Sequence, residues 1–168
     1  MRPTIDSHTR GTVVIDHATY SVHQGLRFKA FYLQPHGSEL ANDATLDILL
    51  KVGSRHIHAV PRLVTGGDMD LLIYKDTTTS NEGTPIEAVA KNQVDNISSG
   101  VTVFSAPTVT APGTVLLNWF VPGGKKGPGM AWSEAQWILK CNTNYLFRIT
   151  NRSGGAIQFG FSLGWMEE

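Results

Sequence analysis

The strongest constraint on the fold is a strict alternation of apolar residues with small or polar ones near the C-terminus. Between Ala156 and Trp165 every second residue is apolar, namely Ile157, Phe159, Phe161, Leu163 and Trp165. Successive side chains of a β-strand point to opposite faces, whereas at helical spacing these five would scatter around the axis. The segment is therefore predicted to be a strand with one buried face.

The same period of two recurs along the chain and predicts a fold built from short strands. Residues 145–150 alternate in this way, and the sequence that follows, Asn-Arg-Ser-Gly-Gly at 151–155, is typical of a hairpin turn. We therefore expect the last two strands to form an antiparallel hairpin. Further strands are predicted at 13–22, 27–34, 45–52, 56–64, 69–74, 101–104 and 115–121.

Many short strands separated by Gly- and Pro-containing turns predict an all-β fold. We expect an antiparallel two-sheet sandwich, jelly-roll-like, with at most one short helix. A length of 168 residues suits a single domain over 1–168. The segment 84–97 disagrees, because its first residues, Thr-Pro-Ile-Glu, resemble a helix capping box and its apolar residues follow one helical face. Helix and strand both stay open there.

Composition narrows the classes of partner. Fourteen Lys and Arg balance 14 Asp and Glu, so general attraction to nucleic acid or to an anionic membrane is not expected. Only 17% of the residues are charged, which is low for a soluble domain and suggests that a partner covers part of the surface. Cys141 is the only cysteine, so no intrachain disulfide can form.

The N-terminal segment 1–12 is polar and lacks the apolar stretch of a signal peptide. It is either a flexible N-terminal arm that orders on a partner or a frayed terminus. No apolar run in the chain approaches the roughly 18 residues of a membrane helix. We therefore expect a soluble protein that stays in a reducing compartment until something else moves it.

Candidate catalytic and metal-binding groups are isolated from one another in the sequence. His56 and His58 would share a strand face, as in a cupin-type metal site, but no nearby carboxylate or later histidine completes the set. Asp68 and Asp70 are interpreted as the polar start of a strand, with a weak calcium contact as the lesser alternative. Cys141 is expected in a turn. We predict no enzymatic activity, no metal and no cofactor.

Candidate contact residues lie in loops and among exposed aromatic groups. The loop at 123–129, Gly-Gly-Lys-Lys-Gly-Pro-Gly, lacks the residue order of a phosphate loop and is expected to be exposed. Trp119 and Trp165 are predicted in the core, and Trp132 at an interface. A sugar-binding module that stacks on Trp132 or Trp119 is an alternative. The predicted interface residues are His17, Tyr20, His23, Lys125, Lys126, Met130 and Trp132.

The segment Glu134–Asn151 resembles a recurrent block, E-x-x-(aromatic)-I-L-K-x-N-T-x-Y-L-x-R-I-T-N. This block is found in head decoration proteins of tailed bacteriophages, small capsid-stabilising or cement proteins encoded near the major capsid protein. Residues 107–114, Pro-Thr-Val-Thr-Ala-Pro-Gly-Thr, resemble the family's P-T-V-T-x-x-G-T stretch. The resemblance runs from about residue 17 and is most specific over 107–165. Two departures are Cys141, where proline is expected, and 84–97, which lacks the family's Asn/Arg-rich character.

The resemblance implies a non-enzymatic virion protein with a β-sandwich or jelly-roll-like fold. Such a protein is made in the host cytoplasm and then binds the major capsid protein on the capsid exterior. It is expected to associate with itself as a homotrimer and to bridge neighbouring capsid subunits. A tail or adaptor component of the same virion is the structural alternative. No catalytic residues carry over from the family.

Overall fold

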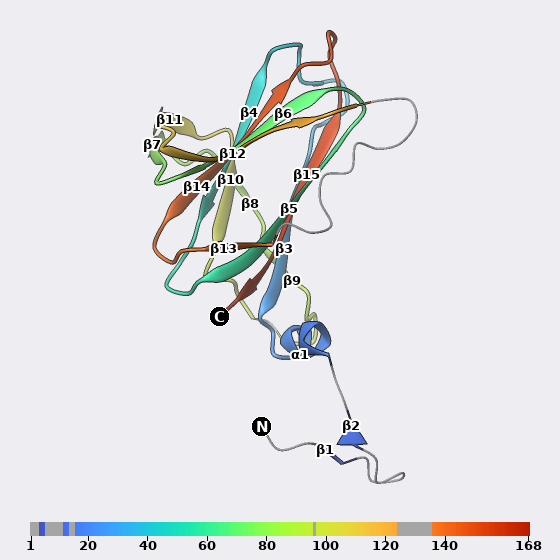
Figure 1. Ribbon diagram of the computed structural model, residues 1–168, viewed down its shortest axis with the longest axis vertical. Helices are drawn as coiled ribbons and strands as arrows, with labels where there is room; N and C mark the ends of the chain where they lie inside the picture. The colour runs from blue at the N-terminus through green and yellow to red at the C-terminus, as the bar shows by residue number, and fades with distance from the viewer. Residues whose placement is uncertain (1–3, 6–11, 14–15, 96, 124–135) are drawn as a thin grey trace.

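The computed structural model describes residues 4–5, 12–13, 16–95, 97–123 and 136–168, and within them two antiparallel sheets pack face to face (Figure 1). The strands that form the body of the sandwich are β3 (Arg27–Leu33), β4 (Thr45–Lys51), β5 (Ile57–Thr65), β6 (Met69–Lys75), β12 (Thr114–Val121), β13 (Trp137–Leu139), β14 (Asn144–Asn151) and β15 (Phe159–Glu167). Shorter elements are β1 (Thr4–Ile5), β2 (Thr12–Val13), α1 (His17–His23), β7 (Thr78–Asn81), β8 (Thr84–Ile86), β9 (Val89–Ala90), β10 (Thr102–Ser105) and β11 (Thr108–Ala111).

The strands of the body alternate between the two sheets along the chain, except that β6 and β12 both belong to the six-stranded sheet and pair with each other. The six-stranded sheet has the order β12-β6-β14-β4-β10-β8, and the five-stranded sheet has the order β13-β5-β15-β3-β9. The first strand of the body pairs with the last, β3 with β15, and the second with the next to last, β4 with β14. This nesting of early strands with late ones is the strand order of a jelly roll. The predicted fold class is confirmed.

The core lies between the sheets and contains the apolar residues that the alternation identified. The four side chains Phe159, Phe161, Leu163 and Trp165 of β15 are each at most 3% exposed. The ring of Phe147 from β14 meets that of Phe161 across the core, with centroids 5.3 Å apart. β15 begins at Phe159, later than predicted, because Ile157 forms an isolated bridge with Leu40.

The predicted hairpin between the last two strands is wrong. β14 pairs with β4 and β6, whereas β15 pairs with β3 and β5, so the segment 152–158 crosses from one sheet to the other. Asn151 anchors this crossing, because its buried side-chain amide donates to the carbonyl oxygens of Leu40 and Gly155, both at 2.7 Å. The turn chemistry is present, with Gly154 at φ +81°, but burial of two aromatic strands decides the pairing.

The strand predicted at 13–22 is wrong over 16–22, because His17–His23 form α1, whereas Val13 lies in the short strand β2. Asp16 is extended, and its carboxylate accepts hydrogen bonds from the backbone amide of Thr19 at 2.9 Å and from its hydroxyl at 2.6 Å. This N-cap satisfies amide hydrogens that the first turn leaves unpaired, and the hydroxyl bond from Thr19 is the largest cause that lowers the pKa of Asp16.

The helix alternative for 84–97 is also wrong in the described part of that segment. β8 pairs with β10 and extends the six-stranded sheet, and β9 pairs with β3 and extends the five-stranded sheet. Ile86 and Ala90 pack against the core, so tertiary contacts outweigh the local capping signal. Pro85 lies in an edge strand, which is where a sheet tolerates a residue without an amide hydrogen.

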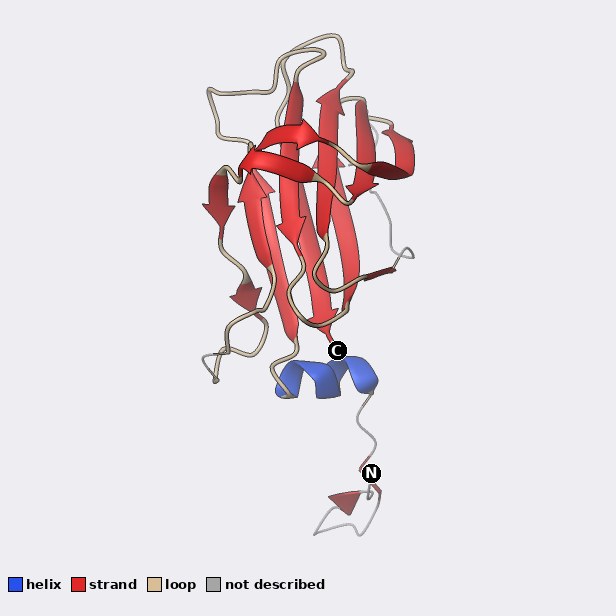
Figure 2. Ribbon diagram, turned by 90° about the vertical axis from the view of Figure 1, so that its left-hand side faces the viewer, coloured by secondary structure: helices blue, strands red, loops and turns tan. Residues whose placement is uncertain are grey.

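The outer face of the six-stranded sheet is covered by a ribbon of two strands. β7 and β11 pair with each other and lie across this face (Figure 2). Leu49 and Leu146 lie outside the cluster that fills the space between the sheets, yet both are 0% exposed. Among the described residues, the broad face that no other element covers is therefore the outer face of the five-stranded sheet.

Truncation of Phe147 to alanine is expected to lower the free energy of unfolding by about 3–5 kcal/mol, because it leaves a cavity where the two sheets meet. Urea unfolding followed by circular dichroism measures the change. Phe120→Ala is the matched control, since Phe120 is half exposed on β12, and should change stability by no more than about 0.5 kcal/mol. Equal losses in both variants would contradict the assigned core.

Candidate interaction surfaces

The outer face of the five-stranded sheet carries a group of exposed apolar side chains at one end, while Ile138 of β13, 70% exposed, lies beside His58 at the other end. Phe31 is 62% exposed and Leu33 66% exposed, both on β3, and Val64 on β5 is 49% exposed. Leu33 and Val64 lie on either side of Gly160 of β15, in one row across three strands. Neighbouring exposed apolar groups of this kind mark contact sites on protein surfaces. We call Phe31, Leu33 and Val64 the apolar end of this face.

The other end of the same face is basic. An open depression there is lined by Arg27, Lys29, His58, Arg62, Lys91 and Gly164, among others. Within the described part of the chain, the arginines and lysines of this depression form no ion pair. Arg148 and Arg152, on other surfaces, do form ion pairs. His58 is paired, with Glu168 at 3.1 Å. We call Lys29, Arg62 and Lys91 the basic end.

Small residues separate the two flanking strands of this face. Gly160, Ser162 and Gly164 of the central strand β15 alternate with the buried residues Phe161 and Leu163, so they lie on the outer side. The flanking strands β3 and β5 carry long side chains at the paired positions, such as Phe31 and Arg62 on either side of Ser162. The result is a trough along β15, which we call the β15 trough.

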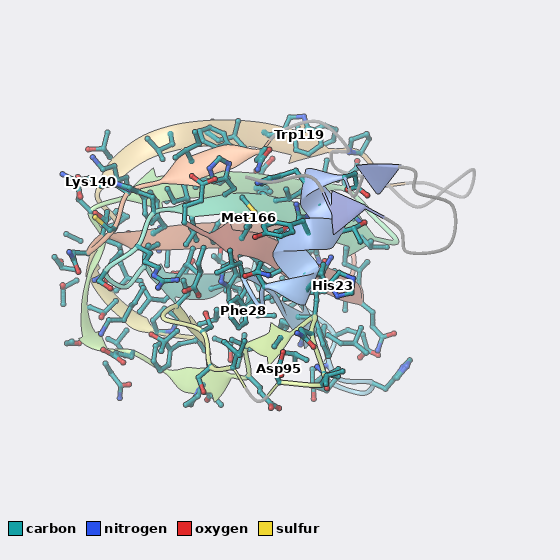
Figure 3. All side chains as sticks on the ribbon, turned by 90° about the horizontal axis from the view of Figure 1, so that it is seen from below. His23, Phe28, Asp95, Trp119, Lys140 and Met166 are labelled. Atoms are coloured by element: carbon teal, nitrogen blue, oxygen red, sulfur yellow. The ribbon has the colours of Figure 1, made fainter. Side chains whose placement is uncertain are left out.

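A second exposed apolar group lies on the edge strand β12. Val115 and Phe120 are each 51% exposed and Leu116 is 36% exposed, and β12 pairs only with β6 among the described strands. Figure 3, which looks at the molecule from below, shows Trp119 of β12 at the opposite side of the body from Asp95. An apolar edge strand is a template for pairing with another chain. This edge is therefore a second candidate contact surface.

The structure gathers three of the predicted interface residues on α1. His17, Tyr20 and His23 are spaced by three residues along this helix, and both histidines are exposed while Tyr20 is half-buried. Their helical position differs from the strand predicted at 13–22, which included His17 and Tyr20. Lys125, Lys126, Met130 and Trp132 lie outside the described residues.

The predicted metal and nucleophile candidates each have a local structural partner. The ring nitrogen Nδ1 of His56 accepts a hydrogen bond from the backbone amide of Cys141 at 3.3 Å, and His58 pairs with Glu168. Cys141 lies in the turn between β13 and β14, as expected. Among the described residues no group of three or more His, Cys, Asp or Glu side chains could hold a metal ion.

The two aspartates at the start of β6 also serve the fold. The carboxylate of Asp68 accepts a hydrogen bond from the backbone amide of Gly123 at 2.8 Å, which ties the end of β12 to β6. Asp70 pairs with Arg152 at 2.8 Å, and Arg152 reaches Asp43 at 2.7 Å. Their interpretation as the polar start of a strand agrees with these contacts.

A stronger ion pair lies on the outer side of the six-stranded sheet. Arg148 donates from Nε and Nη2 to both carboxylate oxygens of Asp47, each at 2.8 Å, and its guanidinium carbon lies 5.7 Å from the centroid of the Tyr74 ring. The hydrogen bonds from Arg148 to Asp47 are the largest cause that raises the pKa of this guanidinium. Such a two-bond pair fixes the register of β14 on β4.

No family model, curated protein or solved structure matches this chain. In the described residues no helix is long and apolar enough to cross a membrane. The proposals below therefore depend on the sequence block and on the surfaces just described. Trp119 is half-buried and packs against the core, and Trp165 is buried, as the sequence predicted.

The apolar and basic ends were not among the predicted interface residues. Their sequence signal is the alternation at 27–33, in which Arg27, Lys29, Phe31 and Leu33 share one side. Phe28, Ala30 and Tyr32 occupy the other side, so both sides hold aromatic residues and the alternation alone does not identify the buried one. The Gly-x-Ser-x-Gly spacing at 160–164 marks the same outer face.

Raising the pH is expected to lower stability through Tyr145. Its hydroxyl accepts a hydrogen bond from the Lys140 amide at 2.9 Å, and burial is the largest cause of a raised pKa. The folded protein then holds this proton more tightly than the unfolded chain, whose tyrosines titrate near about pH 10. The stabilising contribution is complete below that pH and is lost as pH rises through the folded pKa.

Denaturant unfolding of the wild-type protein and the Tyr145→Phe variant between about pH 8 and about pH 11 measures this effect, since that range spans the ordinary tyrosine pKa. The wild type should lose more stability over the range than the variant does, because the variant lacks the titrating hydroxyl. Parallel pH profiles for the two proteins would contradict the prediction.

Proposed function

We propose that this protein is a non-enzymatic head decoration protein of a tailed bacteriophage, which binds the major capsid protein on the capsid exterior. The observation that carries the proposal is the block at Glu134–Asn151 together with the P-T-V-T-x-x-G-T stretch at 107–114. We further propose that the protein associates with itself as a homotrimer and bridges neighbouring capsid subunits.

The structural roles of the block residues support the comparison with that family. Asn142 adopts φ +51° in the turn between β13 and β14, Tyr145 and Phe147 fill the core, and Arg148 pairs with Asp47. Asn151 anchors the crossing between the sheets. The residues of the block therefore hold one central strand in place. Related proteins with the same fold would share residues in this role.

Cementing a shell makes physical demands that this architecture meets. A protein that opposes the outward pressure of packaged DNA must be stiff, and two sheets with a continuous aromatic core resist deformation. It must also carry surface for more than one contact, and the five-stranded face and the β12 edge are two separate exposed apolar surfaces. Many weak contacts repeated around a shell become strong through avidity.

Purified protein mixed with undecorated capsids is expected to co-sediment with them and to saturate at a fixed number of copies per capsid subunit. Capsids that already carry their decoration protein are the control and should take up none, since their sites are occupied. Absence of co-sedimentation with undecorated capsids would contradict the proposed function. Sedimentation equilibrium of the free protein tests self-association, with the mass of three 18.3 kDa chains as the expected result.

Electron microscopy of virions that carry a tagged copy separates the shell from the tail. Label spread over the head is the expected result. Label confined to the tail or the neck would contradict the proposal in favour of a tail or adaptor component.

A further inference from the structure

We propose that the β15 trough binds an extended segment of a partner protein, with carboxylate side chains at the basic end and apolar side chains at the apolar end. The identity of that partner as the capsid protein rests on the proposed function. The chemistry of the segment rests on the trough itself.

Among the described residues, neither packing nor backbone geometry requires glycine at positions 160 and 164 of the trough. Glycine in the middle of a strand costs roughly 0.5–1 kcal/mol relative to alanine, because the unfolded chain gains freedom. A Cβ atom added at Gly160 would have its nearest neighbour at 3.9 Å, and one at Gly164 at 4.0 Å, both ordinary contact distances. By contrast, Gly113 adopts φ +92°, and a Cβ there would lie 2.0 Å from the Lys75 carbonyl oxygen.

Glycines in a strand that neither the backbone nor the packing requires mark places where another chain approaches closely. Both glycines lie on the outer side of the sheet. Between them, Ser162 is the only residue of β15 whose side chain extends into the trough. The absence of side chains here therefore creates space on the outside of the molecule.

The shape of the trough limits what can bind in it. From Gly160 to Gly164 it runs four residues along β15, which is about 13 Å at about 3.3 Å per residue. Its walls stand on β3 and β5, whose axes lie about 10 Å apart because neighbouring strands are spaced by about 4.8 Å. The side chains of Phe31 and Arg62 narrow this width further. A helix needs about 10–12 Å with its side chains, so an extended segment fits and a helix does not.

The charge and polarity of the trough indicate the chemistry of the bound segment. Lys29 and Arg62 are exposed on opposite walls and Lys91 lies beside β3, and within the described chain none of them has an ion pair. A chain of zero net charge that gathers unpaired cations in one depression presents a site for anionic groups. The apolar end is continuous with it, and aromatic and arginine side chains together are typical of protein interfaces. A protein segment satisfies both ends, whereas a nucleic acid backbone would leave Phe31 and Leu33 unmatched.

The sharpest test fills the trough without disturbing the fold. Gly164→Thr places a β-branched side chain on the outer side of a strand, with its Cβ at an ordinary contact distance of 4.0 Å from the nearest described atom, so thermal unfolding should occur at or above the wild-type temperature. Binding of this variant to undecorated capsids should fall by about tenfold or more, since the added side chain blocks close approach. Wild-type binding by a folded Gly164→Thr variant would overturn the trough as the contact site.

Charge reversal is the second test and does not depend on the first. Arg62→Glu should weaken capsid binding by about tenfold at low salt, with a smaller effect at high salt where charges are screened. Lys140→Glu is the matched control, because Lys140 is also an exposed cation without an ion pair in the described residues and lies in the turn before β14, away from Phe28 (Figure 3). It should bind as the wild type does. Equal losses in both variants would overturn the assigned site.

The remaining outcomes separate the two proposals. If wild-type protein fails to bind capsids, the proposed function fails, whatever the variants do. If wild-type protein binds and Gly164→Thr changes only its oligomeric state, the trough is a contact between copies, and the partner segment proposed here is wrong. If nuclease treatment of the capsids abolishes binding, a nucleic acid occupies the site, and the proposal is likewise wrong.

Discussion

The contact between Phe147 and Phe161 ties together the central strands of opposite sheets, and the topology depends on it. β14 and β15 are consecutive in the chain and both are rich in aromatic residues, so each must bury one face. They achieve this by facing each other across the core, with ring centroids 5.3 Å apart, instead of pairing side by side. Once they belong to different sheets, each needs two partner strands, which β4 and β6 provide for one and β3 and β5 for the other.

The same constraint explains which parts of the fold the sequence predicts. The strands at 27–33, 45–51 and 69–75 are predicted from their period of two, although at 27–33 and 45–51 apolar residues stand on both sides and the period does not show which side faces the core. The short strands between residues 78 and 111 show little alternation of apolar and polar residues, since most of them are edge strands with few buried residues. The errors at 13–22 and 84–97 have opposite causes. Asp16 caps a helix where the pattern indicated a strand, and sheet pairing of Ile86 overrides a helix cap.

The pairing of strands is harder to predict than their existence. The Asn-Arg-Ser-Gly-Gly sequence after β14 has the chemistry of a tight turn, but here the chain only bends, with Gly154 at φ +81°, and crosses from one sheet to the other. Burial of the two aromatic strands decides the pairing, and the side chain of Asn151 anchors the crossing through its hydrogen bond to Leu40 in a distant loop. No local pattern contains that information.

The contact surface follows a similar logic. The predicted contact residues belong to loops and to exposed aromatic groups. In the structure, β3 carries aromatic side chains on both of its faces, with Phe28 buried and Phe31 exposed. Only the pairing of β3 with β15 shows which is which. Four of the predicted interface residues, Lys125, Lys126, Met130 and Trp132, belong to the segment between β12 and β13 that lies outside the described residues, so they remain predictions.

The pairing of the earliest strands with the latest ones has a consequence for how the chain is made. β3 and β4 are synthesised long before their partners β15 and β14. Neither sheet has its middle until those two strands emerge, so the cooperative core forms only after that point. In that interval unpaired strand edges face other nascent copies at high local concentration, where pairing with the wrong chain competes with folding.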